Sequence, residues 1–184
     1  MELLVTSVDP PITTVSRADK KHTGKNVEKI GKALNMRVLI AERKGAQEVR
    51  DGRVAFDHAI RQGTLFIVVA PLDATTRGLI ATPELHAMNS TALIVNVARG
   101  GIIDEQALAQ ALHDGQIGGA ATDVFEHEPA TTRENCPLLD PTIPHLILSP
   151  HIAWYSSKTL EGTVATVKKN LEAFVAGAPV NVVA

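Results

Sequence analysis

The sequence predicts an α/β fold in which a doubly wound, Rossmann-like, mostly parallel sheet forms a single domain. Apolar runs such as "TLFIVVAP" (64–71) and "TALIVNVA" (91–98) are nearly continuous, as in strands buried on both faces, and a helix-like segment separates each run from the next. With 184 residues and 45% hydrophobic side chains, the chain is long enough to bury one sizeable core. We therefore expect residues 1–184 to form one domain.

The first elements follow a divergent N-terminal segment, residues 1–23. Apolar positions then recur at helical spacing, which predicts a helix with one face packed on the sheet; they are Val27, Ile30, Gly31 and Leu34. The next elements are expected as a strand at 36–42, a helix at 53–63, the strand at 64–71 and a helix at 81–89. Thr82 is expected at the cap of this last helix and Pro83 in its first turn.

The second half continues the alternation of strands and helices. After the strand at 91–98, Asp104 is expected to cap a helix at 104–115, and short strands follow at 118–125 and 145–151. A long amphipathic helix is expected over residues 156–177, with an apolar stripe at Leu160, Val164, Val167, Leu171 and Phe174. This stripe needs a partner surface, which is either the chain's own sheet or a second subunit of a homodimer.

Composition excludes several classes of function. A net charge of −2 and a pI near 6.4 give no general reason to bind nucleic acid or an anionic membrane surface. The single cysteine, Cys136, excludes an internal disulfide framework, and no apolar run approaches the ~18 residues of a membrane span. The opening residues lack the basic start of a secretory signal, so we expect a cytoplasmic protein with a small-molecule substrate.

Four segments, in order along the chain, carry a family resemblance: "NVARGGIIDEQAL" (96–108), "ATDVFEHEP" (121–129), "LSPHIAWYS" (148–156) and "GAPVNVV" (177–183). They resemble the nucleotide-binding half of the D-isomer-specific 2-hydroxyacid dehydrogenases, the glycerate dehydrogenase and hydroxypyruvate reductase group. The resemblance runs from about Gly24 to Val183. It implies a chain truncated to the NAD-binding half of that family, with one wall of the substrate cleft absent.

The resemblance also implies a catalytic set of Arg99, Glu128 and His151. The planar guanidinium of Arg99 suits a 2-oxo acid carboxylate, which it would hold through paired hydrogen bonds. His151 would give a proton to the carbonyl oxygen, and a neighbouring carboxylate, Glu128, would favour the proton-bearing ring and orient it. Asp123 resembles the family's residue near the nicotinamide, and Pro71 is a further candidate cofactor contact. The other histidines show no metal-ligand spacing, so no metal is expected.

The glycine-rich phosphate turn departs from the family pattern. If Gly24 is the last glycine of a GxGxxG turn, the first two glycine positions fall on Asp19 and Lys21. Side chains there occupy space where the backbone must approach a diphosphate, and a carboxylate repels it. We therefore expect weakened dinucleotide binding, although the cations Lys20, Lys21 and Lys25 favour phosphate.

The choice between NAD and NADP stays open at this stage. Glu42 ends the second family strand, where an acidic residue accepts hydrogen bonds from ribose hydroxyls. Arg43 and Lys44 would instead favour a 2′-phosphate. Both cofactors therefore remain candidates.

The altered turn also leaves the first, central strand of the sheet unassigned. Omitting it would leave unpaired backbone groups on two buried strands. The first candidate is "ELLVTSV" (2–8), the second is "ITTVS" (12–16), and the third is an N-terminal segment exchanged between two subunits.

These observations lead to three functional hypotheses. The first is a repurposed enzyme that carries out cofactor-independent acid/base chemistry, of the isomerase, dehydratase or cyclase type, on a carbonyl or carboxylate substrate. The second is an NAD(P)-dependent oxidoreductase that reduces a 2-oxo acid such as hydroxypyruvate or glyoxylate. The third is a noncatalytic dimeric binding module. The altered glycine turn makes the first our expectation.

Overall fold

The computed structural model describes residues 3–5, 12–15 and 23–182. The chain divides into two compact units, Met1–Pro150 and His151–Ala184. Among the described residues, the strands all belong to the first unit, and the second consists mainly of one long helix.

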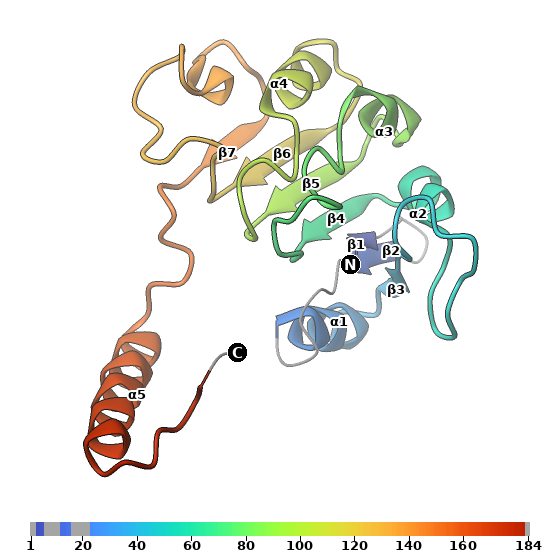
Figure 1. Ribbon diagram of the computed structural model, residues 1–184. Coiled ribbons are helices and arrows are strands. Elements are labelled where there is room, and N and C mark those ends of the chain that lie inside the picture. Colours follow the sequence, from blue (N-terminus) through green and yellow to red (C-terminus); the bar gives the residue numbers. More distant parts are fainter. Residues whose placement is uncertain (1–2, 6–11, 16–22, 183–184) are drawn as a thin grey trace. The chain divides into compact units, whose positions relative to one another are not determined.

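The first unit is built on a seven-stranded sheet in the order β1-β3-β2-β4-β5-β6-β7 (Figure 1). The strands are β1 (Leu3–Val5), β2 (Ile12–Val15), β3 (Arg37–Ile40), β4 (Leu65–Val68), β5 (Leu93–Asn96), β6 (Gly119–Thr122) and β7 (Leu146–Leu148). From β3 through β2 to β7 every neighbouring pair is parallel, whereas β1 is antiparallel to its partners. The predicted Rossmann-like, mostly parallel sheet is therefore confirmed.

The central position of the sheet belongs to β2. This strand pairs in parallel with β3 at Ile12↔Arg37 and with β4 along Thr13↔Leu65, Thr14↔Phe66 and Val15↔Ile67. We expected "ELLVTSV" first for this position, but its residues 3–5 form the antiparallel β1, and residues 12–15 of the second candidate, "ITTVS", form β2. A parallel crossover explains the difference, because the strand that feeds a helix and then β3 must run in the direction of β3.

One face of the sheet is covered by the helices α2 (Phe56–Gln62), α3 (Thr82–Ala87) and α4 (Glu105–His113). Figure 1 shows α3 and α4 side by side along strands β5 and β6. The core between helices and sheet includes Phe66, Ile94, Leu85 and Leu108, each at most 1% exposed. The opposite face is less covered in the described part of this unit, since Leu93 remains 47% exposed and Ile147 69%.

Of the two helix caps predicted from the sequence, the one that begins α4 is confirmed and the one that begins α3 differs. The Asp104 carboxylate accepts a hydrogen bond from the Ala107 N–H at 2.9 Å, as predicted for the start of α4. At α3 the cap residue is Ala81, and Thr82 is the first helical residue. The Glu84 carboxylate accepts from the Ala81 N–H at 3.1 Å, so an acidic side chain at the third helical position reaches back to the cap residue, as in one half of a capping box.

Helix α1 (Thr23–Ala33) approaches the sheet through its glycines. Gly24 and Gly31 are buried, whereas Ile30 is 59% exposed and Leu34, just past the helix end, is 65% exposed. The predicted apolar face is thus only partly buried in the described residues. Glycines without side chains let the helix backbone pack closely on β2 and β3.

The second unit consists mainly of α5 (Ser157–Val175). The Ser156 hydroxyl accepts a hydrogen bond from the Thr159 N–H at 3.2 Å, which caps the helix near its predicted start. The side chains of the predicted stripe are exposed, among them Val167 (53%) and Leu171 (62%). Among the helices of the described residues, none combines the length and the apolar character that crossing a membrane requires.

Candidate active site

A cleft of about 650 Å³ opens in the first unit where β4 and β5 end. Its walls include Thr23, Pro71, Leu72, Ala98 and Arg99. Thr23 begins α1, so the cleft joins the start of this helix to the carboxyl ends of two parallel strands. Open α/β sheets bind their ligands at such a point, where connections leave the central strands in opposite directions. The structure therefore brings two predicted residues, Pro71 and Arg99, to one cleft.

The turn that carries Arg99 is held by the side chain of Asn96. Asn96 is 3% exposed, its Nδ2 donates to the Arg99 carbonyl oxygen at 3.0 Å, and its Oδ1 accepts from the Ala98 N–H at 3.1 Å. The Arg99 Nη1 donates to the Ala98 carbonyl oxygen at 2.6 Å. These bonds fix the backbone of the turn, and the exposed guanidinium retains further N–H donors for an anion.

A second turn carries Glu128 and packs against the first. The Glu128 Oε1 accepts from the Phe125 N–H at 3.0 Å, which folds the carboxylate back on its own loop. Gly100 touches the same loop so closely that an added Cβ would lie 1.8 Å from the Phe125 carbonyl oxygen. The turns bearing Arg99 and Glu128 can therefore pack directly against each other because residue 100 has no side chain.

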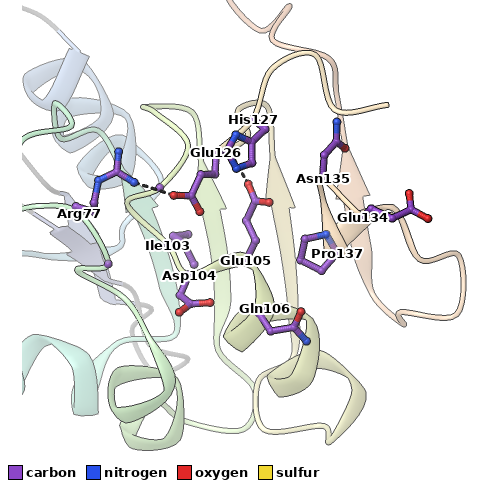
Figure 2. Close-up of a pocket in the computed structure, with 12 residues that line it drawn as sticks. Arg77, Ile103, Asp104, Glu105, Gln106, Glu126, His127, Glu134, Asn135 and Pro137 are labelled. Carbon is purple, nitrogen blue, oxygen red and sulfur yellow. Dashed lines mark hydrogen bonds and ion pairs between the residues drawn. The ribbon is translucent and has the colours of Figure 1, made fainter. Parts of the chain in front are cut away.

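The loop after β6 is also held from outside the cleft. The Glu126 N–H donates to the Glu105 Oε1 at 2.7 Å, and the Arg77 Nη1 pairs with the Glu126 Oε1 at 2.7 Å. Figure 2 shows these side chains around a second hollow, of about 370 Å³, beside the start of α4. Glu105 is only 7% exposed, so the loop that leads to Glu128 is held by a hydrogen bond to a buried carboxylate.

Asp123 stands at the carboxyl end of β6 and is 5% exposed. The Ser149 hydroxyl donates to its Oδ1, and the Asp123 N–H donates to the Asn96 carbonyl oxygen at 3.0 Å. The predicted residue near the nicotinamide is therefore tied to the strand that precedes Arg99.

His151 begins the second unit. Its backbone adopts a left-handed conformation, with φ of 55°, and its carbonyl oxygen accepts a hydrogen bond from the Trp154 Nε1 at 2.8 Å. Residues with a side chain adopt this conformation at a cost of about 1 kcal/mol or more. Such residues often occur at functional sites.

Glu42 lies just after β3, as predicted, but its carboxylate is already engaged. It is 2% exposed, accepts from the Arg43 N–H at 2.9 Å, and is bound by both Nε and Nη2 of Arg50. Hydrogen bonds from the Arg50 side chain, with smaller contributions from the backbone N–H groups of Arg43 and Arg50, lower the pKa of Glu42 to about 2 against the opposing effect of burial. Lys44, the other predicted phosphate contact, pairs with Glu84 at 2.7 Å.

The lowered pKa of Glu42 predicts a specific dependence of stability on pH. A carboxylate whose folded pKa lies below its ordinary value of 4.5 stabilises the fold fully above pH 4.5, and the contribution is lost as pH falls toward 2. We expect the wild type to unfold at higher urea concentration than Glu42→Gln at neutral pH. The difference should shrink as pH falls through this window, as measured by urea unfolding at a series of pH values.

The control for this series is Glu172→Gln, which removes an exposed carboxylate on α5. Its effect on the free energy of unfolding should be small at every pH. If the difference in the free energy of unfolding between the wild type and Glu42→Gln did not change between neutral pH and pH 2, the ion pair of Glu42 would be contradicted.

Residues 16–22 lie outside the described residues, and with them Asp19, Lys20 and Lys21. The expectation that side chains at Asp19 and Lys21 obstruct a diphosphate therefore stays a prediction. Gly24, the last glycine of the proposed turn, is buried in the first turn of α1.

Sequence reasoning missed the residues that hold the site in place. Asn96, Glu105 and Arg50 touch the turns or the carboxylate that carry the predicted roles. Asn96 and Glu105 lie within the motif "NVARGGIIDEQAL", where a polar residue at the end of an apolar strand is a usable signal. Arg50 has no such signal, because it meets Glu42 only through the folding of the loop between them.

Comparisons with known proteins agree with the fold of the first unit. A model of the family described as "D-isomer specific 2-hydroxyacid dehydrogenase, NAD binding domain" matches residues 22–153. A glycerate dehydrogenase of Methylorubrum extorquens is 40% identical over 162 residues, which cover 87% of this chain and 49% of that protein. A glyoxylate reductase of Pyrococcus horikoshii is 36% identical over 158 residues, which cover 84% of this chain and 46% of that protein.

Among solved structures, a D-lactate dehydrogenase of Aquifex aeolicus complexed with NAD and lactic acid superposes with a TM-score of 0.75 at 26% identity. The match covers 89% of this chain and 54% of that one. The chain thus spans about half the length of the relatives it matches.

Proposed function

Because the chain belongs to the D-isomer specific 2-hydroxyacid dehydrogenase family through its NAD binding domain, we propose that it binds NAD or NADP and acts in the reduction of a small 2-oxo acid. Relatives named glycerate dehydrogenase and glyoxylate reductase point to hydroxypyruvate or glyoxylate as the substrate. The observation that carries the proposal is the shared cleft, where Pro71 and Arg99 meet the start of α1. The family assignment favours this function over the cofactor-independent acid/base enzyme expected first, and it gives no support to a noncatalytic module.

The residues of the cleft fit an adenine dinucleotide. The N–H groups at the start of α1 form a site for an anion, and the buried Gly24 lets the helix lie close to the sheet there. The volume of about 650 Å³ lies within the range of small-molecule sites, and the walls include the apolar Pro71 and Leu72. Such a cofactor, when bound, supplies the hydride for the carbonyl carbon of the substrate.

In this proposal Arg99 binds and orients the substrate. Its guanidinium is exposed, and the Asn96 side chain holds the backbone that carries it. Two parallel N–H···O bonds to a carboxylate fix both the position and the plane of a 2-oxo acid. A lysine at this position would supply the charge without that orientation.

His151 and Glu128 handle the proton in this proposal. The ring of His151 gives a proton to the carbonyl oxygen as hydride arrives at the carbon, which yields the 2-hydroxy acid. The family resemblance gives Glu128 the role of favouring the proton-bearing ring, and the Phe125 N–H holds the Glu128 carboxylate on its loop. In the reverse direction His151 accepts the proton of the hydroxyl group.

The decisive test pairs fluorescence titration with NADH and NADPH with an assay of hydroxypyruvate and glyoxylate reduction. We expect at least one cofactor to bind with a dissociation constant between about 1 μM and 1 mM and to support turnover. Arg99→Met should leave cofactor binding nearly unchanged and lower kcat/KM, since it removes the contact to the substrate carboxylate. If neither NADH nor NADPH binds, the proposal is overturned.

The same titration measures the effect of the altered glycine turn. If side chains at Asp19 and Lys21 obstruct the diphosphate, the double variant Asp19→Gly, Lys21→Gly binds the cofactor more tightly than the wild type. Equal affinity would show that the turn accommodates the diphosphate with its present residues.

That two copies of the chain associate also stays a prediction, for which sedimentation equilibrium is the direct test.

A further inference from the structure

We propose that Arg50 makes this site select a dinucleotide that carries a 2′-phosphate on its adenosine ribose, because Arg50 occupies the carboxylate that would otherwise bind the ribose hydroxyls. The inference deepens the proposed function, on which it rests. It assigns a specificity-determining role to a residue that lies outside the family motifs.

The acceptor positions of Glu42 are filled from within the chain. Its Oε1 accepts from the Arg43 N–H at 2.9 Å and from the Arg50 Nη2, and its Oε2 accepts from the Arg50 Nε at 2.6 Å. The Arg50 N–H and the Arg53 Nε lie 3.4 and 3.7 Å from the same Oε2. A carboxylate offers about four lone-pair sites. A ribose diol therefore cannot gain the paired hydrogen bonds to Glu42 unless Arg50 leaves.

Displacement of Arg50 by a ribose is unfavourable. It would exchange a bidentate pair between two opposite charges for bonds from neutral hydroxyl donors, and it would leave the Arg50 guanidinium without its carboxylate partner. Glu42 is also 2% exposed, so little of its surface is available to a ligand while the pair is intact. The acidic residue thus loses its usual ability to favour the unphosphorylated cofactor.

The charge around Glu42 favours an additional anion. Arg50 and Arg53 bring two positive charges to the one negative carboxylate of Glu42, and Arg43 follows it directly in the sequence. The Arg43 side chain is exposed, and no side-chain partner for it lies among the described residues. The Arg50 side chain is 55% exposed, so part of it faces solvent while its Nε and Nη2 hold Glu42. A phosphate dianion fits this surplus, whereas a hydroxyl group does not.

The loop between Glu42 and Arg50 is shaped to make this pair. Gly45 and Gly52 both have φ of 74°, a conformation that glycine adopts without the strain of a side chain. The loop returns to the sheet where Val54 forms a parallel bridge with Ala41 and its carbonyl oxygen accepts from the Glu42 N–H at 2.7 Å. Both ends of the loop are therefore anchored beside Glu42, which brings Arg50 to the carboxylate.

The test uses two fragments that differ only in the 2′-phosphate, adenosine 2′,5′-bisphosphate and AMP, together with NADPH and NADH. Dissociation constants are measured by calorimetry for the fragments and by fluorescence titration for the dinucleotides. For the wild type we expect the bisphosphate to bind at least 10-fold more tightly than AMP, and NADPH at least 10-fold more tightly than NADH. In Arg50→Met both ratios should fall by about 10-fold or more, in part because NADH gains access to Glu42.

Two further variants keep the test clear if Arg50→Met does not fold. Arg50→Lys keeps the charge and loses the paired hydrogen bonds, so its ratios should lie between those of Arg50→Met and the wild type. Arg61→Met is the matched control, since it removes an exposed arginine from the end of α2 and should leave both ratios unchanged.

The outcomes separate this inference from the proposed function. If the wild type binds AMP as tightly as the bisphosphate, or NADH as tightly as NADPH, the inference is wrong although a dinucleotide still binds. If neither dinucleotide binds while the bisphosphate is preferred in an Arg50-dependent way, the proposed function fails and the 2′-phosphate site stands. If no probe binds at all, both are overturned.

Discussion

His151→Asn is expected to lower kcat for 2-oxo acid reduction by about 10²- to 10⁴-fold, the contribution of a well-placed general acid. Asparagine cannot give a proton to the developing alkoxide, yet it tolerates the left-handed backbone that His151 adopts with φ of 55°. The substitution therefore removes the proton donor with little added backbone strain. Steady-state kinetics with hydroxypyruvate or glyoxylate measure the loss, and cofactor titration should show an unchanged dissociation constant.

His145 offers a matched control for this variant. It is also a histidine with φ of 55°, it is exposed, and it precedes β7 in the first unit. His145→Asn carries the same chemical change and the same backbone requirement, but it should leave kcat within about 2-fold of the wild type, as expected of a residue without a part in proton transfer. If His151→Asn kept more than a tenth of the wild-type kcat, His151 would not be the general acid.

Gly100→Ala is expected to have the largest effect on the fold of the site. A Cβ at this position would lie 1.8 Å from the Phe125 carbonyl oxygen and 2.4 Å from the Glu126 nitrogen, far inside van der Waals contact with rigid backbone. The turns that carry Arg99 and Glu128 would have to separate. We expect a loss of about 3 kcal/mol or more in the free energy of unfolding, measured by urea denaturation, with a fall in kcat/KM.

Gly162→Ala is the corresponding control. Gly162 lies inside α5, where an added Cβ meets nothing within 4 Å. Alanine should stabilise that helix by roughly 0.5–1 kcal/mol, because glycine loses more backbone freedom on folding. A Gly100→Ala protein that unfolded at the wild-type urea concentration, and kept its kcat/KM, would show that the two turns do not pack as described.

Local sequence patterns determined much of this protein. Apolar runs bounded by polar turns located β4 and β5, and the Asp104 cap located the start of α4, because each depends on neighbours within a few residues. The ordered motifs around Arg99, Glu128 and His151 identified the family, since each motif is a short continuous stretch of sequence that can be recognised without the fold.

Tertiary structure decided the features that depend on residues far apart in the chain. The choice of β2 over β1 for the central position follows from parallel pairing with both β3 and β4, which β1 meets only in the antiparallel direction. The contact of Gly100 with Phe125 and the capture of Glu42 by Arg50 depend on loops folding back on the sheet. The physical reason is that local patterns encode the conformation of a segment, whereas pairing, close packing and charge neutralisation are properties of the surface that each segment meets.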